Sequence, residues 1–273
     1  MVHQLAGARV LVTGASGGIG AALAFGFAAA GSRVAICARR RERLDDVLDS
    51  FPGGRDRHRA FTVDFADLDA TDRLAADVVD GLGGLDVLIN NAGIPKRRWA
   101  WDHRPDEIAA VLRINVEAPI RLTTALLPSL TADGGGTVIF IGSVAARLAP
   151  PAEAAYAASK AAVTAYAEGL RVDLGVAGRP LDVHVVQPGV VDTDLFTIPD
   201  NDLSLADIEP IPVDALVEPV LRLVTDGGPM ETFVPGWFAD LPPVKVADTD
   251  GFLQGAVEYT LGRLTDLGIE RPR

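Results

Sequence analysis

Tyr156 and Lys160 are the residues whose types and spacing most directly suggest chemistry. They stand four positions apart in an alanine-rich run over Ala152–Gly175 that predicts a helix, so both side chains share one helix face. A tyrosine of ordinary pKa needs its phenolate favoured by about 3 units to act as a base near neutral pH. A lysine ammonium at about 4 Å supplies much of that. The pair therefore suggests proton transfer; a half-buried tyrosine beside a lysine is also ordinary helix packing.

Two other polar residues stand where apolar packing does not require them. Ser143 follows the predicted strand Thr137–Ile141, where its hydroxyl could hydrogen-bond a substrate oxygen or cap a helix. Asn115 lies inside the helical pattern Pro105–Leu130, shortly before Pro119. Asparagine is unfavourable inside a helix, so we expect a kinked helix with a freed backbone carbonyl there.

A glycine-rich turn near the N-terminus predicts a nucleotide cofactor. An apolar strand over Arg9–Thr13 leads through Gly14, Gly18 and Gly20 into a helix over Ile19–Ala30, with Gly31 at its C-cap. Glycines at such a turn let the chain bend sharply and bring a diphosphate close to the backbone N–H groups. Thr13 and Ser16 can hold this turn in place. By itself the spacing is also compatible with a purely structural turn.

The ends of the second and third predicted strands indicate which dinucleotide binds. Arg39 and Arg40 follow the strand Arg33–Ala38, where a protein that binds NAD usually has a carboxylate for the ribose 2′-hydroxyl. Arginines suit a 2′-phosphate, which favours NADP(H) over NAD(H); the alternative is a solvated basic turn. Asp64 follows the strand Arg59–Val63 and could accept a hydrogen bond from adenine. Equally, Asp64 or Asp67 could cap the next helix.

Strand-like and helix-like runs alternate along the whole chain. This pattern predicts an α/β fold with a doubly wound parallel sheet of about seven strands and helices on both faces, in a single domain over residues 1–273. The carboxyl ends of parallel strands form the ligand-binding edge of such sheets, where the polar residues above are expected to meet. The remaining predicted strands are Asp86–Asn90, Asp182–Gln187 and Phe233–Val234, and the remaining helices Arg40–Ser50 and Thr71–Leu82.

Composition excludes several classes of function. The 273 residues carry a formal net charge of −12, which disfavours nucleic acid as a partner. A single cysteine, Cys37, excludes an intrachain disulfide and a cysteine-rich metal site, and we predict no metal. No apolar run approaches the length of a membrane span, and the first residues lack the pattern of a signal peptide. We therefore expect a cytoplasmic protein without a membrane partner.

Together, several motifs in the right order resemble the short-chain dehydrogenase/reductase family in its compact single-domain branch. They cover residues 8 to about 195 and are TGASGGIG, the NNAG of residues 90–93, Asn115, Ser143, the Tyr156 and Lys160 pair, and Pro188-Gly189 followed by Thr193. The resemblance implies a Rossmann fold and hydride transfer between a nicotinamide and a carbonyl carbon.

The resemblance also implies a role for each residue of the motifs. Tyr156 is expected to be the general acid/base, and Lys160 to hold the nicotinamide ribose and lower the tyrosine pKa. Ser143 is expected to orient the substrate oxygen, and the kinked helix at Asn115 to hold a water that links Lys160 to solvent. The other cofactor contacts are expected at Ile19, Asn91 and Val191, with Thr193 at the carboxamide.

Three segments depart from the family or bear on the substrate. Residues 194–215, with Phe196 and Ile198, resemble a substrate lid. The chain continues through an extension over about residues 229–273, expected to be structural, although it could also cover the pocket or pack between subunits. Lys96-Arg97-Arg98, beside Trp99 and Trp101, is expected to be a solvated or interface turn and, less favoured, an attractor of anionic substrates. An apolar pocket is expected from Ala145, Ala146, Leu148 and Phe196.

These observations favour an NADP(H)-dependent alcohol dehydrogenase or carbonyl reductase acting on a fairly apolar small molecule. The alternatives are an NAD-dependent alcohol dehydrogenase of the same family and a dinucleotide-sensing protein without turnover. Retention of Asn115, Ser143, Tyr156 and Lys160 weighs against the sensor. The resemblance further implies a homodimer or homotetramer built on the helices at Pro105–Leu130 and Ala152–Gly175.

Overall fold

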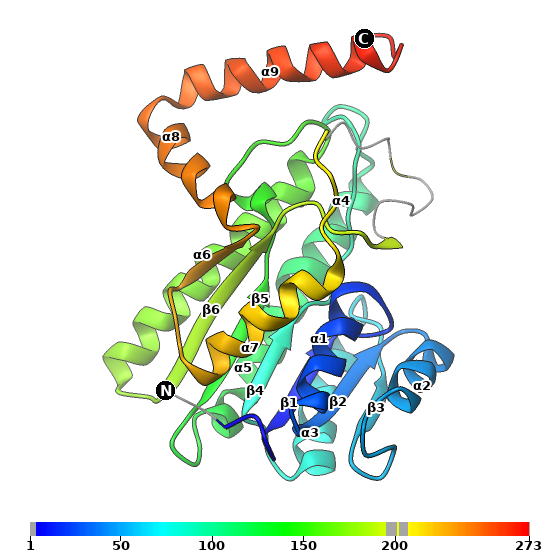
Figure 1. Cartoon of the computed structure of the whole chain (residues 1–273), viewed down its shortest axis with the longest axis vertical. Helices are drawn as coiled ribbons and strands as arrows, with labels where there is room; N and C mark the ends of the chain where they lie inside the picture. The colour runs from blue at the N-terminus through cyan, green and yellow to red at the C-terminus, as the bar shows by residue number, and fades with distance from the viewer. Residues whose placement is uncertain (1–3, 195–200, 202–206, 273) are drawn as a thin grey trace.

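A computed structural model describes residues 4–194, 201 and 207–272 of the chain. Its centre is a sheet of seven parallel strands in the order β3-β2-β1-β4-β5-β6-β7 (Figure 1). The chain order reverses direction between β1 and β4, which is where a doubly wound sheet opens a crevice for ligands. The strands are β1 Arg9–Thr13, β2 Arg33–Ala38, β3 Arg59–Thr62, β4 Val87–Asn90, β5 Gly136–Ile141, β6 Leu181–Pro188 and β7 Glu231–Val234.

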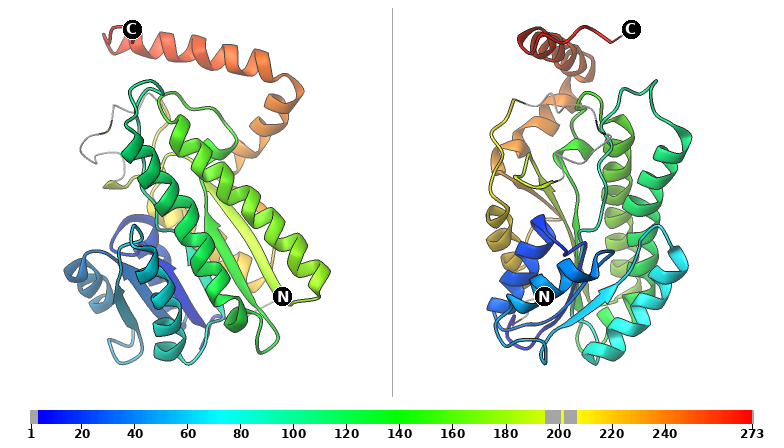
Figure 2. Two further views of the ribbon diagram at one scale, coloured as in Figure 1. Left: turned by 180° about the vertical axis from the view of Figure 1, so that it is seen from behind. Right: turned by 90° about the vertical axis from the view of Figure 1, so that its right-hand side faces the viewer.

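Helices cover both faces of this sheet (Figure 2). One face carries α1, α2 and α7, and the other carries α3, α5 and α6. Two apolar cores result, one on each side. In β1, Val10 and Val12 belong to the first core and Leu11 to the second, because successive side chains of a strand point to opposite faces. The helices are α1 Gly18–Ala29, α2 Arg41–Asp49, α3 Leu68–Leu82, α4 Pro105–Leu112, α5 Ala118–Leu130, α6 Ala154–Ala177 and α7 Val217–Thr225.

The fold class predicted from the sequence is confirmed, with local corrections. The predicted helix Pro105–Leu130 is α4 and α5 joined by a π-helical turn, Arg113–Glu117, so the break expected at Asn115 is a wide turn inside a continuous helix. Helix α3 begins at Leu68 rather than Thr71. Ala30, not Gly31, is the C-cap of α1, and Gly31 follows it with a φ of 90°.

The C-terminal part of the chain contains structure that the sequence pattern did not resolve into elements. After β7 a short 3-10 turn (Gly236–Asp240) leads into α8 (Leu241–Ala247) and then α9 (Thr249–Asp266). Helix α9 lies across the end of the molecule toward which the strands point (Figures 1 and 2). Of the predicted lid, Ile211 forms a parallel bridge with Val191, while Phe196 and Ile198 lie outside the described residues.

Candidate active site

The glycine turn between β1 and α1 has no room for side chains at two of its three motif glycines. A Cβ on Gly20 would lie 2.5 Å from the Asn91 side-chain nitrogen and 2.6 Å from the Gly14 carbonyl oxygen. Gly14 has a φ of 67°, and a Cβ there would lie 2.7 Å from the Cα of Ala92. Gly17, by contrast, has open space around it. The turn is thus a cradle of bare backbone, as a dinucleotide diphosphate requires.

Asn91 and Thr13 hold this cradle against the end of β4. The Asn91 side-chain amide donates to the carbonyl oxygens of Thr13 at 2.9 Å and Gly14 at 3.3 Å. The Thr13 hydroxyl accepts from the backbone N–H groups of Asn91 and Ala92, both at 2.9 Å. Asn91 therefore fixes the shape of the turn directly, a role beyond the cofactor contact expected from the sequence.

The other predicted cofactor residues border the same turn. Ile19 lies in the first turn of α1, half-buried against the core. Thr193 lies beside Gly18, where an added Cβ would be 3.2 Å from the threonine methyl. Val191 is buried two residues earlier. The loop after β6 thus reaches the start of α1 and closes one side of the cradle.

Arg39 and Arg40 both lie exposed at the carboxyl end of β2. The Arg40 guanidinium donates to the Ser16 hydroxyl at 3.2 Å, so it leans toward the glycine turn. The ion pairs that the structure describes include none to Arg39, and none that joins Glu42 to either arginine. Two uncancelled positive charges therefore stand where the ribose 2′-substituent of a dinucleotide is read.

Asp64 and Asp67 have separate roles after β3. The Asp67 carboxylate is the N-cap of α3 and accepts from the backbone N–H of Ala70 at 3.0 Å. Asp64 stays exposed and accepts from the N–H of Ala66 at 3.0 Å. Capping is thus performed by Asp67, which leaves the Asp64 carboxylate with acceptor capacity for an adenine amino group.

Tyr156, Ser143 and Lys160 come together at the carboxyl end of β5. Tyr156 lies in the first turn of α6, and Ser143 begins a 3-10 turn (Val144–Ala146) after β5. Lys160 is one helical turn beyond Tyr156, with its Nζ 5.8 Å from the tyrosine ring centre. That ammonium is buried and donates to the backbone carbonyl of Ile141 at 2.8 Å.

Electrostatics at these side chains differ from the sequence expectation in one respect. Burial raises the pKa of Tyr156, and the nearby Glu153 carboxylate raises it further, while a hydrogen bond with Ser143 and the Arg97 charge lower it. Burial also lowers the pKa of Lys160 to about 8. The net pKa of Tyr156 is thus raised here, because desolvation outweighs the influences that lower it.

Asn115 links three segments behind the lysine. Its side-chain oxygen accepts from the N–H of Ile94 at 2.8 Å, and its amide donates to the Ile94 carbonyl at 2.9 Å and the Ser159 hydroxyl at 3.0 Å. Gly93 is also adjacent, since a Cβ there would lie 3.2 Å from the Asn115 oxygen and 3.5 Å from Lys160 Nζ. This amide lies inside the π-helical turn Arg113–Glu117, a feature that is frequent at functional sites.

Gln187 supports Ser143 and was missed as a site residue. Its side-chain oxygen accepts from the Ser143 N–H at 2.6 Å, and its amide donates to Glu231 at 2.7 Å and Thr164 at 3.1 Å. Gln187 is fully buried at the end of β6. The available signal was a glutamine directly before the Pro188-Gly189 motif, after the apolar pair Val185-Val186.

The basic run after β4 contradicts the expected solvated turn. Lys96 and Arg97 are buried, and Lys96 pairs with the buried Glu107 at 2.7 Å. Arg98 and Arg104 also approach Glu107, at 3.5 and 2.9 Å. A carboxylate from α4 draws these cations inward, because a buried charge requires partners.

Two further findings concern the residues that the structure describes. They contain no cluster of histidine, cysteine and acidic side chains that could hold a metal ion. None of the helices they form is long and apolar enough to cross a membrane.

A sheet with this topology, a bare glycine cradle after β1 and a serine, tyrosine and lysine beyond β5 are features of an NAD(P)-binding oxidoreductase with a Rossmann-like fold. Residues 8–202 match the family model for short chain dehydrogenases. The chain therefore belongs to the short-chain dehydrogenase/reductase family of oxidoreductases.

Curated relatives match over most of this chain. It is 36% identical over 211 residues to a short chain dehydrogenase of Pseudocercospora fijiensis, a match covering 76% of this chain and 67% of that protein. It is 37% identical over 194 residues to dehydrogenase/reductase SDR family member 7B of Bos taurus, covering 69% of this chain and 59% of that protein. The match thus leaves a substantial part of the bovine protein unaligned.

Solved structures extend the likeness over nearly the whole fold. A short chain dehydrogenase from Burkholderia cenocepacia, solved in complex with NADP, is 36% identical with a TM-score of 0.73, covering 83% of this chain and 94% of that one. A short-chain dehydrogenase from Streptomyces avermitilis is 32% identical with a TM-score of 0.75, covering 95% of both chains.

Proposed function

We propose that this protein is an NADP(H)-dependent alcohol dehydrogenase or carbonyl reductase that acts on a fairly apolar small molecule. The observation that carries the proposal is the convergence of Ser143, Tyr156 and Lys160 beyond β5, at the same sheet edge as the glycine cradle. When bound, the nicotinamide supplies or accepts the hydride at the carbonyl carbon.

The residues of the chain handle the substrate oxygen and its proton. The Ser143 hydroxyl holds the oxygen, while Tyr156 gives up its proton as a ketone becomes an alcohol and takes one back in the reverse direction. The raised pKa of Tyr156 keeps the phenol protonated near neutral pH, which suits the reductive direction. The buried ammonium of Lys160 stabilises the phenolate that results and binds the ribose of the cofactor.

The preference for NADP(H) rests on Arg39 and Arg40. Guanidinium groups form paired hydrogen bonds with a phosphate, and no carboxylate stands at this position to recognise a free 2′-hydroxyl. The cradle and the exposed Asp64 provide room for the diphosphate and an acceptor for the adenine. The Burkholderia relative solved with NADP is consistent with this choice.

Equilibrium binding of NADPH and NADH tests this preference, read by energy transfer from tryptophan to the reduced nicotinamide. We expect NADPH to bind at least about tenfold more tightly. The Arg39→Ser and Arg40→Ser variants should each lose about tenfold in NADPH affinity and little in NADH affinity. Arg43→Ser, which changes an exposed arginine inside α2, is the matched control and should bind both nucleotides normally.

Two results would contradict this proposal, and each would favour a different function. Tighter binding of NADH would make the arginines solvated charges and favour an NAD-dependent alcohol dehydrogenase. Tight binding without turnover of ketones or alcohols would favour a dinucleotide sensor.

We further propose that residues 1–273 act as one domain, with a substrate lid within residues 194–215, and assemble as a homodimer or homotetramer. The exposed apolar residues of α4 and α6 support the assembly. A cytoplasmic location is supported by the single cysteine, Cys37, which is buried and reduced.

A further inference from the structure

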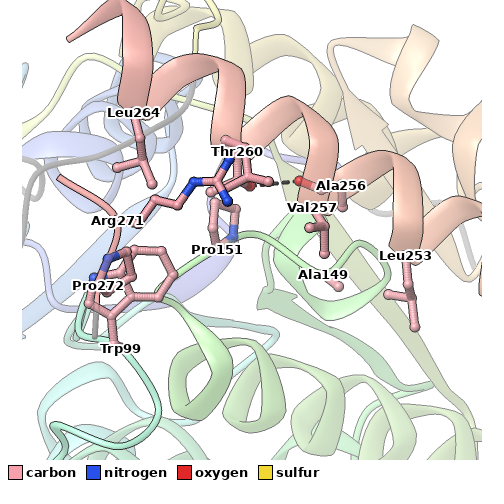
Figure 3. A pocket seen from close by; sticks show the side chains of 11 residues that line it. Trp99, Ala149, Pro151, Leu253, Ala256, Val257, Thr260, Leu264, Arg271 and Pro272 are labelled. Atoms are coloured by element: carbon pink, nitrogen blue, oxygen red, sulfur yellow. Dashed lines mark hydrogen bonds between the residues drawn. The ribbon is translucent and has the colours of Figure 1, made fainter. Parts of the chain in front are cut away.

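Helix α9 turns one apolar face toward two loops of the molecule (Figure 3). The residues on this face recur at intervals of three and four, which is the period of one helix stripe. The stripe consists of Leu253, Ala256, Val257, Thr260, Leu261 and Leu264. Between it and the loops lies a cavity of about 410 Å³, within the range of small-ligand pockets.

The cavity is apolar and open to water. The opposite wall is formed by Trp99, from the loop after β4, and by Ala149 and Pro151, from the loop before α6. The one polar group on the α9 stripe, the Thr260 hydroxyl, donates to the Ala256 carbonyl of its own helix. Val257 is 52% exposed although it faces the cavity. Unfilled apolar surface of this kind is stabilised when an apolar ligand covers it.

The loops that line the cavity are those that position the catalytic residues. Ala149 and Pro151 precede Tyr156 in the segment that joins the Ser143 turn to α6. The backbone N–H of Arg98, next to Trp99, donates to the Ala152 carbonyl at 2.7 Å, so the two loops meet at the start of α6. The cavity therefore lies beside the segment that leads into the helix of Tyr156.

Helix α9 is held in place by contacts with another segment of the chain. The Tyr259 hydroxyl accepts from the backbone N–H of Asp207 at 2.9 Å, and Arg263 pairs with the Asp207 carboxylate at 3.3 Å. Asp248 caps the helix by accepting from the N–H of Gly251 at 2.9 Å. The first two contacts tie α9 to Asp207, a residue of the segment that precedes α7.

We infer that this cavity, the α9 groove, binds an unbranched apolar chain of the substrate that extends away from the reacting carbonyl. The inference rests on the proposed function and names its substrate class: ketones or alcohols with a long alkyl or acyl chain. The groove has a hydrocarbon lining, joins the catalytic loops at one side, and has the Arg271 side chain on its lining (Figure 3).

Straight-chain methyl ketones from butanone to dodecanone, assayed with NADPH, test the inference. In the native protein kcat/KM should rise with chain length, by up to about fourfold for each added methylene that becomes buried. Ala256→Phe fills the groove and Val257→Asp places a charge in it, so both should flatten this dependence by at least about tenfold at dodecanone. Both should leave butanone turnover unchanged, because butanone does not reach the groove.

Val246→Asp is the matched control for Val257→Asp. Val246 is an 81% exposed valine of α8 that does not line the groove. This variant should retain the full chain-length dependence. Normal butanone turnover in each variant demonstrates that the catalytic site is intact.

A binding measurement tests whether the groove binds an apolar chain even if no ketone is turned over. A dodecanone brominated at its far end should quench the fluorescence of Trp99, which lines the groove, and of Trp101, which stacks on it at 5.5 Å. Ala256→Phe should remove the quenching, while Trp237→Phe should keep it.

The outcomes separate the two proposals. Butanone turnover with no chain-length dependence and no quenching would overturn the groove and leave the proposed function standing. Quenching without turnover of any ketone or alcohol would overturn the proposed function. A third outcome is that Val257→Asp has a lower oligomer mass in sedimentation while the brominated dodecanone still quenches its fluorescence. This outcome would assign the stripe to contact with a second copy of the chain and overturn the inference.

Discussion

Tyr156 holds its proton under opposing influences that come from different parts of the chain. Burial and the Glu153 carboxylate favour the neutral phenol, whereas Ser143 and Arg97 favour the phenolate. Glu153 is the N-cap residue of α6, and burial raises its own pKa. In the proposed reaction, an acidic residue so close to Tyr156 makes the oxidative direction harder, since oxidation needs the phenolate.

Glu153→Gln should therefore shift the pH dependence of alcohol oxidation. Above the pKa of Glu153 the carboxylate is negative and raises the pKa of Tyr156, so removing the charge lowers that pKa. The acid limb of kcat/KM should move to lower pH by about 0.5 to 1 unit.

Glu168→Gln is the matched control for this experiment. Glu168 is an exposed glutamate of the same helix, paired with Arg147 at 2.7 Å. Its variant should keep the native profile. An unshifted profile in Glu153→Gln, or equal shifts in both variants, would show that the Glu153 charge does not act on Tyr156.

At the scale of the secondary-structure elements, the β1–α1 turn leaves no room for a side chain at Gly14 or Gly20. Its geometry is held by side chains of a different strand, since Asn91 donates to the carbonyl oxygens of Thr13 and Gly14. The same amide occupies the space that a side chain at Gly20 would need. Element packing therefore determines which glycine matters, even where several are adjacent in the sequence.

Gly20→Ala and Gly17→Ala form a matched pair of variants at neighbouring positions of this turn. The first should weaken NADPH binding by at least about tenfold and lower the free energy of unfolding by about 1 to 3 kcal/mol, because the new Cβ forces Asn91 or Gly14 to move. The second should change neither, since nothing lies within 4 Å of its Cβ. Nucleotide titration and urea denaturation measure both effects; equal losses would contradict the packing argument.

At the scale of the whole molecule, one face of helices stands out as a candidate surface for assembly. The continuous helix formed by α4 and α5 lies beside α6 on this face (Figure 2). Leu112 of α4 is 43% exposed and Val172 of α6 is 65% exposed. Apolar residues left on such helices are typical of subunit interfaces.

The double variant Leu112→Glu, Val172→Glu should lower the sedimentation-equilibrium mass from that of the oligomer toward that of the 28.6 kDa chain. Burying two unpaired carboxylates in an interface costs several kcal/mol of association free energy, about 2 or more for each. Phe25→Glu, on α1 at the opposite face, should leave the mass unchanged. An unaltered mass in the double variant would place the interface elsewhere.

Local patterns in the sequence were sufficient to predict the sheet, most of the helices and the residues that meet at the strand ends. The alternation of runs defines a doubly wound sheet, and the spacing of Tyr156 and Lys160 defines a shared helix face. The glycines after the first strand indicate a sharp turn, because glycine adopts backbone conformations that other residues avoid. Each of these depends on neighbours within about one element, which is why sequence alone predicts them.

Only the tertiary structure decided how charged and apolar side chains are partnered over long distances. Lys96 and Arg97 look solvated in sequence but are buried: Lys96 pairs with Glu107 of α4, and the Arg97 charge acts on Glu153, the N-cap residue of α6, and on Tyr156. The Lys160 ammonium points to the Ile141 carbonyl, and α9 lies over the loops that contain Trp99 and Pro151. The burial and the charge balance of these side chains depend on residues far apart in the sequence. The local spacing of residues does not indicate which of these distant residues will come into contact.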